Sequence, residues 1–168
     1  MRIIAGKYRR RNLKSPPSLQ VRPTSDRLRE TLFNVIALRI EGARFLDLCA
    51  GSGAVGIEAL SRGASQATFV DKSRKMCALV EANLDLCGVP EEQTEVVNAE
   101  ARDYLSRALK PLLTRGLPTR SRKLQFTSWN IVFFDPPYAT DYLSVIELFG
   151  QNTGELLAEA GMLIVEHH

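Results

Sequence analysis

The sequence predicts an α/β fold, in which a doubly wound and mostly parallel sheet lies between helices. Five short apolar segments alternate with stretches whose apolar residues recur every three or four positions, the pattern of repeated strand–helix units. A glycine-rich turn, Gly51-x-Gly53-x-x-Gly56, follows the first of these segments and opens a helix. The simplest strand order is 3-2-1-4-5, and 168 residues suit one such domain.

A basic segment and a helix precede the first strand. Residues 1–20 are expected to form an extended arm or a hairpin, with Arg2 to Ile4 as a short strand. A helix is predicted from Asp26, where Thr24 or Ser25 can cap it, to Gly42. Apolar spacing predicts that its buried face consists of Leu28, Thr31, Leu32, Val35 and Ile36, with Arg27 and Arg29 outside that face.

Strands and helices then alternate along the chain. The predicted strands are Phe45–Leu48, Gln66–Asp71, Thr94–Val97, Trp129–Phe134 and Gly161–Val165. The predicted helices cover residues 54–60, 73–88, 101 to about 113 and 142–149, and residues 114–128 are expected to form an exposed loop. The fifth strand would be an apolar edge, which soluble proteins usually cover, so further strands are expected beyond residue 168.

Charge is unevenly distributed along the sequence. Residues 1–30 contain nine Lys and Arg residues against two acidic residues, a net charge of +7, and since the whole chain carries +3 the remainder sums to −4. A basic extension on a mildly acidic body suggests an anionic polymer as partner, and a merely solvated tail is the plainer alternative that charge alone leaves open. Tyr8 lies among these charges and either stacks on a base or packs on the domain.

Composition argues against several classes of protein. No apolar run approaches the roughly 20 residues of a membrane span, and no apolar segment follows the basic N-terminus as in a secretory signal. The three cysteines are odd in number and lack metal-ligand spacing, which indicates reduced thiols in a cytoplasmic protein. No metal site is expected, and the oligomeric state is open, with a monomer favoured.

The glycine turn predicts a nucleotide-like cofactor. Gly51 and Gly53 leave room for a ligand against the backbone, and Asp71 follows where the dinucleotide fingerprint has its acid. Asp47, Asp71, Glu100 and Asp135 come at or after the carboxyl ends of four predicted strands, which meet at one edge of a parallel sheet. An NAD-dependent oxidoreductase is one interpretation of this arrangement.

The segment Asp135-Pro136-Pro137-Tyr138 indicates a different chemistry. Two prolines end the fourth strand sharply and leave the Pro136 carbonyl free to face the cleft beside the Asp135 carboxylate. Two acceptors directed at one point suit an exocyclic amine, and Tyr138 can stack on the base that carries it. The plainer alternative is a strand-ending turn with a packed tyrosine. An oxidoreductase would leave both this loop and the basic extension unexplained.

Together these segments resemble the RsmD family of class I S-adenosylmethionine-dependent methyltransferases, which methylate the N2 amine of a guanine in bacterial 16S ribosomal RNA. The N-terminal blocks are specific to that family, whereas the glycine turn and the Asp-Pro-Pro-Tyr loop are shared with many amino-group methyltransferases. The matching blocks are Arg2-Ile-Ile-Ala-Gly-Lys7, Arg22-Pro-Thr-Ser-Asp-Arg27 with Arg29-Glu30, Asp47 to Gly53, Glu58 to Ala64 and Asp135 to Tyr138.

The resemblance implies a role for each matched position. S-adenosyl-L-methionine would be bound by Asp47, Ala50, Gly51, Ser52, Gly53, Asp71, Lys72, Glu100 and Ala101. The guanine amine would be held by Asp135, Pro136, Pro137 and Tyr138. Phosphates of 16S rRNA, free or in the small ribosomal subunit, would be contacted by Arg9, Arg10, Arg11, Arg22, Thr24 and Arg27.

The implied organisation is a basic RNA-contacting extension, residues 1–24, and a Rossmann-like methyltransferase domain, residues 25–168. Two further alternatives stay open beside the oxidoreductase. One is an N6-adenine methyltransferase acting on DNA or RNA, which would use the same acceptor loop. The other is a catalytically silent RNA-binding module that keeps the fold.

Overall fold

The computed structural model describes residues 1–16, 26–109, 128–137 and 142–166 of the chain. Its centre is a five-stranded sheet with the order β3-β2-β1-β4-β5, in which every neighbouring pair is parallel. The strands are β1 (Arg44–Leu48), β2 (Gln66–Asp71), β3 (Thr94–Asn98), β4 (Trp129–Phe134) and β5 (Leu157–Val165). The predicted fold class and strand order are therefore confirmed.

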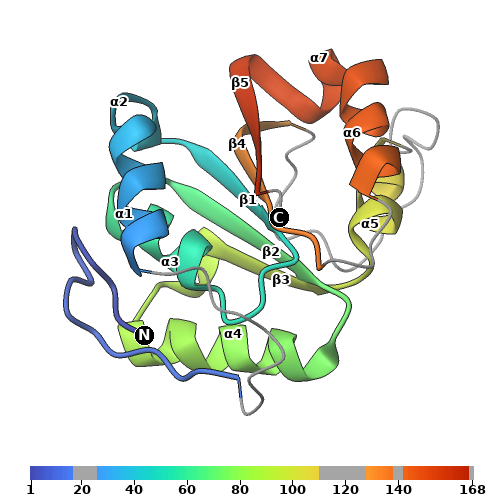
Figure 1. Ribbon diagram of the computed structural model, residues 1–168. Coiled ribbons are helices and arrows are strands. Elements are labelled where there is room, and N and C mark those ends of the chain that lie inside the picture. Colours follow the sequence, from blue (N-terminus) through green and yellow to red (C-terminus); the bar gives the residue numbers. More distant parts are fainter. Residues whose placement is uncertain (17–25, 110–127, 138–141, 167–168) are drawn as a thin grey trace.

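Helices cover both faces of this sheet (Figure 1). One face carries α1 (Asp26–Val35), α2 (Ala37–Ile40), α3 (Ala54–Ser61) and α4 (Arg74–Cys87). The other face carries α5 (Ala101–Leu109), α6 (Tyr142–Gln151) and α7 (Thr153–Leu156), while a short 3-10 turn, η1 (Glu91–Gln93), leads into β3. Among the described residues the chain thus forms a three-layer α/β/α sandwich.

Each strand contributes alternate side chains to two separate cores, because successive residues of a strand point to opposite faces of the sheet. The core beneath α1 to α4 contains Phe45, Ala67, Phe69, Ile131 and Phe133. The core beneath α5 to α7 contains Leu46, Leu48, Val70, Val132 and Phe134. Apolar residues on both faces are the reason that these strands lack a polar alternation in the sequence.

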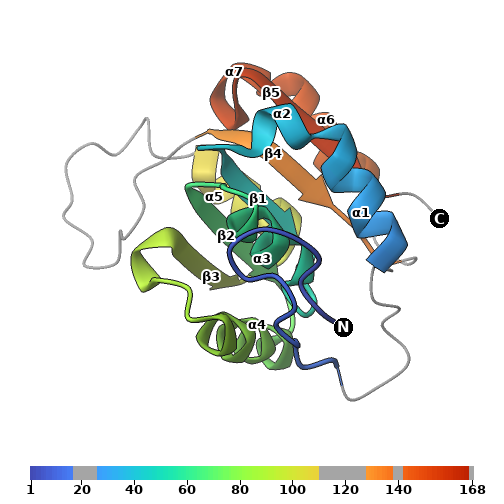
Figure 2. The same ribbon diagram turned by 90° about the vertical axis from the view of Figure 1, so that its left-hand side faces the viewer.

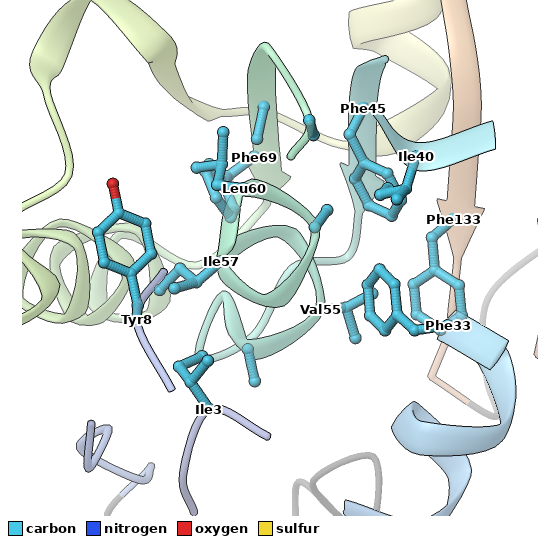
Figure 3. Packing of buried hydrophobic residues seen from close by; sticks show 14 of the residues in the cluster. Ile3, Tyr8, Phe33, Ile40, Phe45, Val55, Ile57, Leu60, Phe69 and Phe133 are labelled. Atoms are coloured by element: carbon cyan, nitrogen blue, oxygen red, sulfur yellow. The ribbon is translucent and has the colours of Figure 1, made fainter. Parts of the chain in front are cut away.

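Helix α3 is buried along its whole length. Figure 3 shows Phe33, Phe45 and Phe133 on one side of this helix and Ile3 and Tyr8 on the other. A helix buried all round needs a cover on the side that faces away from the sheet. The beginning of the chain supplies that cover.

Residues 1–14 form this cover and are called the N-terminal hairpin below (Figure 2). An antiparallel bridge joins Arg2 to Asn12, and the Leu13 N–H donates to the Met1 carbonyl over 2.9 Å. Tyr8 is only 3% exposed and belongs to the same core as Ile3, so it packs on the domain and does not stand free for a base. The hairpin alternative is confirmed, whereas the division of the chain at residue 24 stays a prediction.

The predicted buried face of the first helix is confirmed at Ile36, which is buried, and in part at Leu32, which packs partly buried on the same core, but it is wrong elsewhere. Arg29 is 0% exposed and Phe33 is buried, whereas Leu28 is exposed and Val35 is 80% exposed. The cause is the N-terminal hairpin, which docks beside this helix and accepts a hydrogen bond from Arg29 Nη2 on the Arg2 carbonyl at 2.7 Å. The helix also breaks at Ile36, between α1 and α2, instead of running unbroken to Gly42.

The end of the sheet differs in detail from the prediction. Strand β5 begins at Leu157, four residues earlier than expected, and α7 precedes it. Ala160 adopts a left-handed φ of 57°, and the register with β4 shifts between Trp129 and Ile131. Helix α5 is described as far as Leu109, so its predicted extension to 113 and nearly all of the predicted loop at 114–128 lie outside the described residues.

Candidate functional site

Four acidic residues converge where the carboxyl ends of the strands meet. Asp47 and Asp71 belong to β1 and β2, Asp135 directly follows β4, and Glu100 lies two residues beyond the end of β3. All four act on the Cys49 thiol. Its pKa is raised to about 12, first by burial and then by the negative charges of Asp71, Asp47, Asp135 and Glu100. The sequence prediction of one common rim is thus confirmed, and Cys49 stays a neutral thiol at ordinary pH.

The turn after β1 has an unusual backbone. Cys49, Gly51 and Gly53 all have positive φ angles, of 64°, 55° and 76°. A Cβ atom on Gly51 would meet nothing within 4 Å, so this glycine borders open space at the rim. A Cβ atom on Gly56 would lie 2.8 Å from Cζ of Phe69 and closer still to Cε1. The first glycine therefore leaves room for a ligand, and the last permits α3 to pack on β2.

Asp71 ties this turn to the neighbouring strand. Its Oδ2 accepts the Gly51 N–H at 2.9 Å, and its Oδ1 accepts the Ser73 N–H at 2.8 Å. The Ala50 N–H donates to the Val70 carbonyl over 3.0 Å, next to these contacts. The acid that the fingerprint requires therefore also fixes the backbone of the glycine turn.

Asp47 lies beneath the turn and is 2% exposed. Its Oδ2 accepts the Gly56 N–H at 2.9 Å, which satisfies one of the free amides in the first turn of α3. Burial raises the pKa of Asp47 well above its ordinary value, although the Gly56 amide opposes that shift, and the charges of Asp135 and Asp71 raise it further. The observed contact is structural, and direct binding of a cofactor by Asp47 stays a prediction.

The ends of β2 and β3 form an adjoining polar edge. Lys72 Nζ and Glu100 Oε1 lie 3.7 Å apart, and both side chains are more than half exposed. Asn98 was not predicted as a site residue, but its Nδ2 donates to the carbonyls of Asp71 and Lys72 over 3.0 and 2.9 Å. An asparagine directly after a strand was the available signal. Ala101 begins α5 and is buried beside this edge.

The Asp-Pro-Pro segment lies next to the glycine turn. Leu48 and Phe134 are partners in the β1–β4 register, and the Asp135 N–H donates to the Leu48 carbonyl over 3.4 Å. Asp135 and Pro136 are half-buried and Pro137 is exposed. Tyr138 lies outside the described residues. The amine-holding pair predicted from sequence, the Asp135 carboxylate and the Pro136 carbonyl, therefore starts at the same rim as the turn.

The described cations of the N-terminal hairpin face solvent. Arg9, Arg10 and Arg11 are exposed, and Arg11 also donates through Nη1 to the Leu86 carbonyl over 2.8 Å. Arg27 is exposed on α1. Arg22 and Thr24, the remaining residues predicted to contact RNA, lie outside the described residues.

Glu58 and Ser61 of α3 hold the hairpin in place, and sequence reasoning gave neither a role. Glu58 is completely buried and accepts the N–H groups of Ile4 and Ala5 at 2.8 and 3.0 Å and the Arg62 Nε–H at 2.7 Å. Ser61 Oγ accepts the Tyr8 N–H at 2.9 Å. The signal was a glutamate inside an otherwise apolar helix, since such a charge needs buried partners.

Neither a membrane-spanning helix nor a metal-binding cluster occurs among the described residues. Over that part of the chain no helix has the length and hydropathy needed to cross a bilayer. Within the same residues no three His, Cys, Asp or Glu side chains are grouped so that they could hold a metal ion.

Comparison with known proteins gives consistent matches over nearly the whole chain. The family model described as "Conserved hypothetical protein 95" matches residues 1–168. The "Ribosomal RNA small subunit methyltransferase D" of Escherichia coli (strain K12) is 38% identical over 167 residues, which cover 99% of this chain and 74% of that protein. Bacillus subtilis YlbH is 34% identical over 167 residues, with coverage of 99% and 82%. The solved structure of yhhF from Escherichia coli matches with a TM-score of 0.78 and 36% identity, over 98% of this chain and 79% of that one.

Proposed function

The chain belongs to the conserved hypothetical protein 95 family, the RsmD family, and on that premise we propose that it methylates the exocyclic N2 amine of a guanine in 16S ribosomal RNA. Methyl transfer to small-subunit ribosomal RNA is the activity named for the Escherichia coli relative. The observation that carries the proposal is the shared rim, where the glycine turn, Asp71 and Asp135 lie at the ends of neighbouring strands.

The methyl donor in this proposal is S-adenosyl-L-methionine, which supplies an electrophilic methyl group on a sulfonium. Gly51 leaves open space at the turn for the methionine end of that cofactor. Asp71 is half-exposed at the end of β2, where a carboxylate can accept hydrogen bonds from ribose hydroxyls. Lys72, Glu100 and Ala101 continue the same edge toward the expected position of the adenine.

Asp135 and the Pro136 carbonyl would accept the two hydrogens of the guanine amine. Two acceptors fixed at the end of β4 would align the nitrogen lone pair with the methyl carbon and would stabilise the charge that develops on nitrogen. The N–C bond forms as the C–S bond breaks, the bonding electrons go to sulfur, and the nitrogen releases one proton to water. This direct transfer uses neither a metal ion nor a covalent intermediate.

The N-terminal hairpin would contact RNA phosphates. Arg9 and Arg10 project from a hairpin that Glu58 and Ser61 hold on α3, so the charges have a fixed position relative to the rim. Binding that depends on phosphate contacts weakens as the salt concentration rises. The slope of the logarithm of the binding constant against the logarithm of salt concentration becomes shallower by about one unit for each contacting cation that is removed. Arg9→Gln with Arg10→Gln should therefore reduce the slope by roughly two, whereas Arg107→Gln on α5 should leave it unchanged.

The deciding experiment measures methyl transfer from radiolabelled S-adenosylmethionine to small ribosomal subunits that lack the native methylation. Asp135→Ala should reduce kcat on the order of 10²- to 10³-fold, by analogy with the loss of one preorganised hydrogen-bonding group, with little change in cofactor affinity. Asp85→Ala, which removes an exposed carboxylate from α4, is the matched control. Normal transfer by Asp135→Ala would contradict the assigned role.

Nucleoside analysis of the labelled RNA then identifies the methylated atom. Label on guanine N2 supports the proposal, and label on adenine N6 would favour the other amino-group reaction, because the same two acceptors fit either amine. Failure to bind S-adenosylhomocysteine, combined with binding of NAD, would instead support the oxidoreductase interpretation of the glycine turn.

A further inference from the structure

Three segments meet at one buried side chain, Asn83 of α4. The Asn83 side chain is 0% exposed. Its Oδ1 accepts the Lys14 N–H at 2.8 Å, and its Nδ2 donates to the Lys14 carbonyl over 3.1 Å and to the Ser52 carbonyl over 2.9 Å. One amide therefore joins the last residue of the N-terminal hairpin to the middle of the glycine turn.

Chemistry allows only one orientation of this amide. The Lys14 N–H needs an acceptor, and two carbonyl groups need donors, so rotating the amide by 180° would place like groups against each other at all three contacts. The bond to Ser52 is buried and the two bonds to Lys14 are partly buried, so leaving the amide without its partners would cost free energy. The Asn83 side chain thus acts as a clamp of fixed orientation, in which Oδ1 accepts one hydrogen bond and Nδ2 donates two.

A second contact joins the same two segments. Met1 Sδ lies 3.7 Å from Ser52 Oγ, and the Met1 carbonyl accepts the Leu13 N–H at the other end of the hairpin. Both ends of the hairpin are therefore connected to Ser52. Met1 contacts the Ser52 hydroxyl directly, and Lys14 is linked to the Ser52 carbonyl through Asn83. A displacement of the hairpin must be transmitted to that residue.

The turn that receives this displacement contains one residue in a sparsely populated conformation. Gly51 and Gly53, on either side of Ser52, adopt positive φ angles that glycine reaches without strain, but Cys49 is left-handed although it carries a side chain. Its conformation persists only where the contacts around the turn impose it. Asn83 supplies one of those contacts, and the turn is the segment that would border the methionine end of the cofactor.

We propose that Asn83 is a positioning residue that couples RNA binding at the N-terminal hairpin to cofactor binding at the glycine turn. This inference rests on the proposed function, since it assumes that the hairpin binds RNA and the turn binds S-adenosylmethionine. RNA that fixes the hairpin also fixes Ser52, so the cofactor meets a turn that is already ordered. By thermodynamic linkage, the cofactor raises the affinity for RNA by the same factor.

The test measures the dissociation constant of S-adenosylhomocysteine, which binds without turnover, with and without saturating unmethylated small ribosomal subunits. In the unaltered protein the subunits should tighten binding at least about fivefold, the lower end of typical coupling between sites. Asn83→Ala should bring that factor close to one. Asn130→Ala is the matched control, because it removes a hydrogen bond from the Arg44 N–H at the opposite end of the sheet. It should keep the full factor.

The ratio of the two dissociation constants separates coupling from simple loss of stability. A factor near one in the unaltered protein, or an equal factor in Asn83→Ala, would overturn the proposal. Equal loss in Asn130→Ala would also overturn it, since the effect would not be specific to the clamp. Failure of the unaltered protein to bind S-adenosylhomocysteine at all would refute the proposed function instead, and this inference with it.

Amide hydrogen exchange gives a readout that needs no variant, should Asn83→Ala fail to fold. Subunits bound to the unaltered protein should slow exchange at Gly51 and Gly53, whose amides donate to the Asp71 carboxylate and to the Ala50 carbonyl. Unchanged exchange at the turn, with slowed exchange in the hairpin, would contradict the coupling.

Discussion

Gly56→Ala tests whether the third glycine of the turn is a packing requirement. The added Cβ would lie 2.8 Å from Cζ and 3.0 Å from Cδ1 of Phe69, and closer still to Cε1. Phe69 is 1% exposed, so its ring has no solvent to move into. Either α3 must move away from β2 or the ring must leave its rotamer.

The expected cost follows from two opposing effects. Overpacking of a buried core costs about 1–3 kcal/mol, and contact with three ring atoms favours the upper end of that range. Alanine has a better helix propensity than glycine and returns up to about 1 kcal/mol. The net loss is therefore about 2 kcal/mol, which lowers Tm by roughly 4–8 °C in a domain of this size.

Thermal and urea unfolding measure this loss against a matched variant. Gly150 lies near the end of α6, is exposed, and has nothing within 4 Å of an added Cβ, so Gly150→Ala should be neutral or stabilising by up to about 1 kcal/mol. In a Phe69→Leu background Gly56→Ala should cost less, which a double-mutant cycle reports as coupling. If Gly56→Ala is as stable as Gly150→Ala, the packing argument is wrong.

Three further variants test the buried polar contacts. Gly6→Ala combines a φ of 79° with a Cβ 2.8 Å from Ser61 Oγ and closer to the Ser61 carbonyl, so the hairpin should undock and trypsin should cut it faster; unchanged cleavage would contradict this. Glu58→Gln should lose about 1–3 kcal/mol of unfolding free energy, because an amide has one acceptor oxygen where the carboxylate uses two. Glu147→Gln, at an exposed position, should change little. Asp47→Asn should gain stability relative to the unaltered protein as pH rises. The raised pKa of Asp47 contributes its full stabilisation of the folded state below pH 3.8, where the carboxyl is protonated in both states. Between pH 3.8 and the raised pKa the unaltered protein loses this stabilisation at about 1.4 kcal/mol per pH unit, whereas the asparagine variant does not. An equal difference at pH 4 and pH 8 would contradict the last prediction.

The sheet and the rim could be predicted because their signals are local. A buried parallel strand is a short apolar run, and β2 and β4 were placed with the bounds that the structure has. Acids at the ends of such strands must meet, since the carboxyl ends of parallel strands share one edge. The position of Asp71 against Gly51 follows from these two facts.

The buried face of α1 could not be predicted because it depends on a distant segment. Apolar spacing alone allowed a stripe through Leu28 and Val35, and Phe33 with Ile36 and Ile40 offered another at equally helical spacing. The hairpin offers the Arg2 carbonyl to Arg29, and Phe33 packs on Phe45 of β1 with 6.4 Å between ring centroids. The same holds for Asn83, whose partners Lys14 and Ser52 are 69 and 31 residues away.

The N-terminal hairpin also sets an order for folding. It is synthesised before every partner that it needs, since Ile4 bonds to Glu58, Lys14 to Asn83 and Arg11 to Leu86, across 54, 69 and 75 residues. At roughly 5–20 residues per second, about 3–14 seconds of translation separate Lys14 from Asn83. A strongly basic segment thus spends that time without its final contacts, and the closing of this long loop is expected to be a late step in folding.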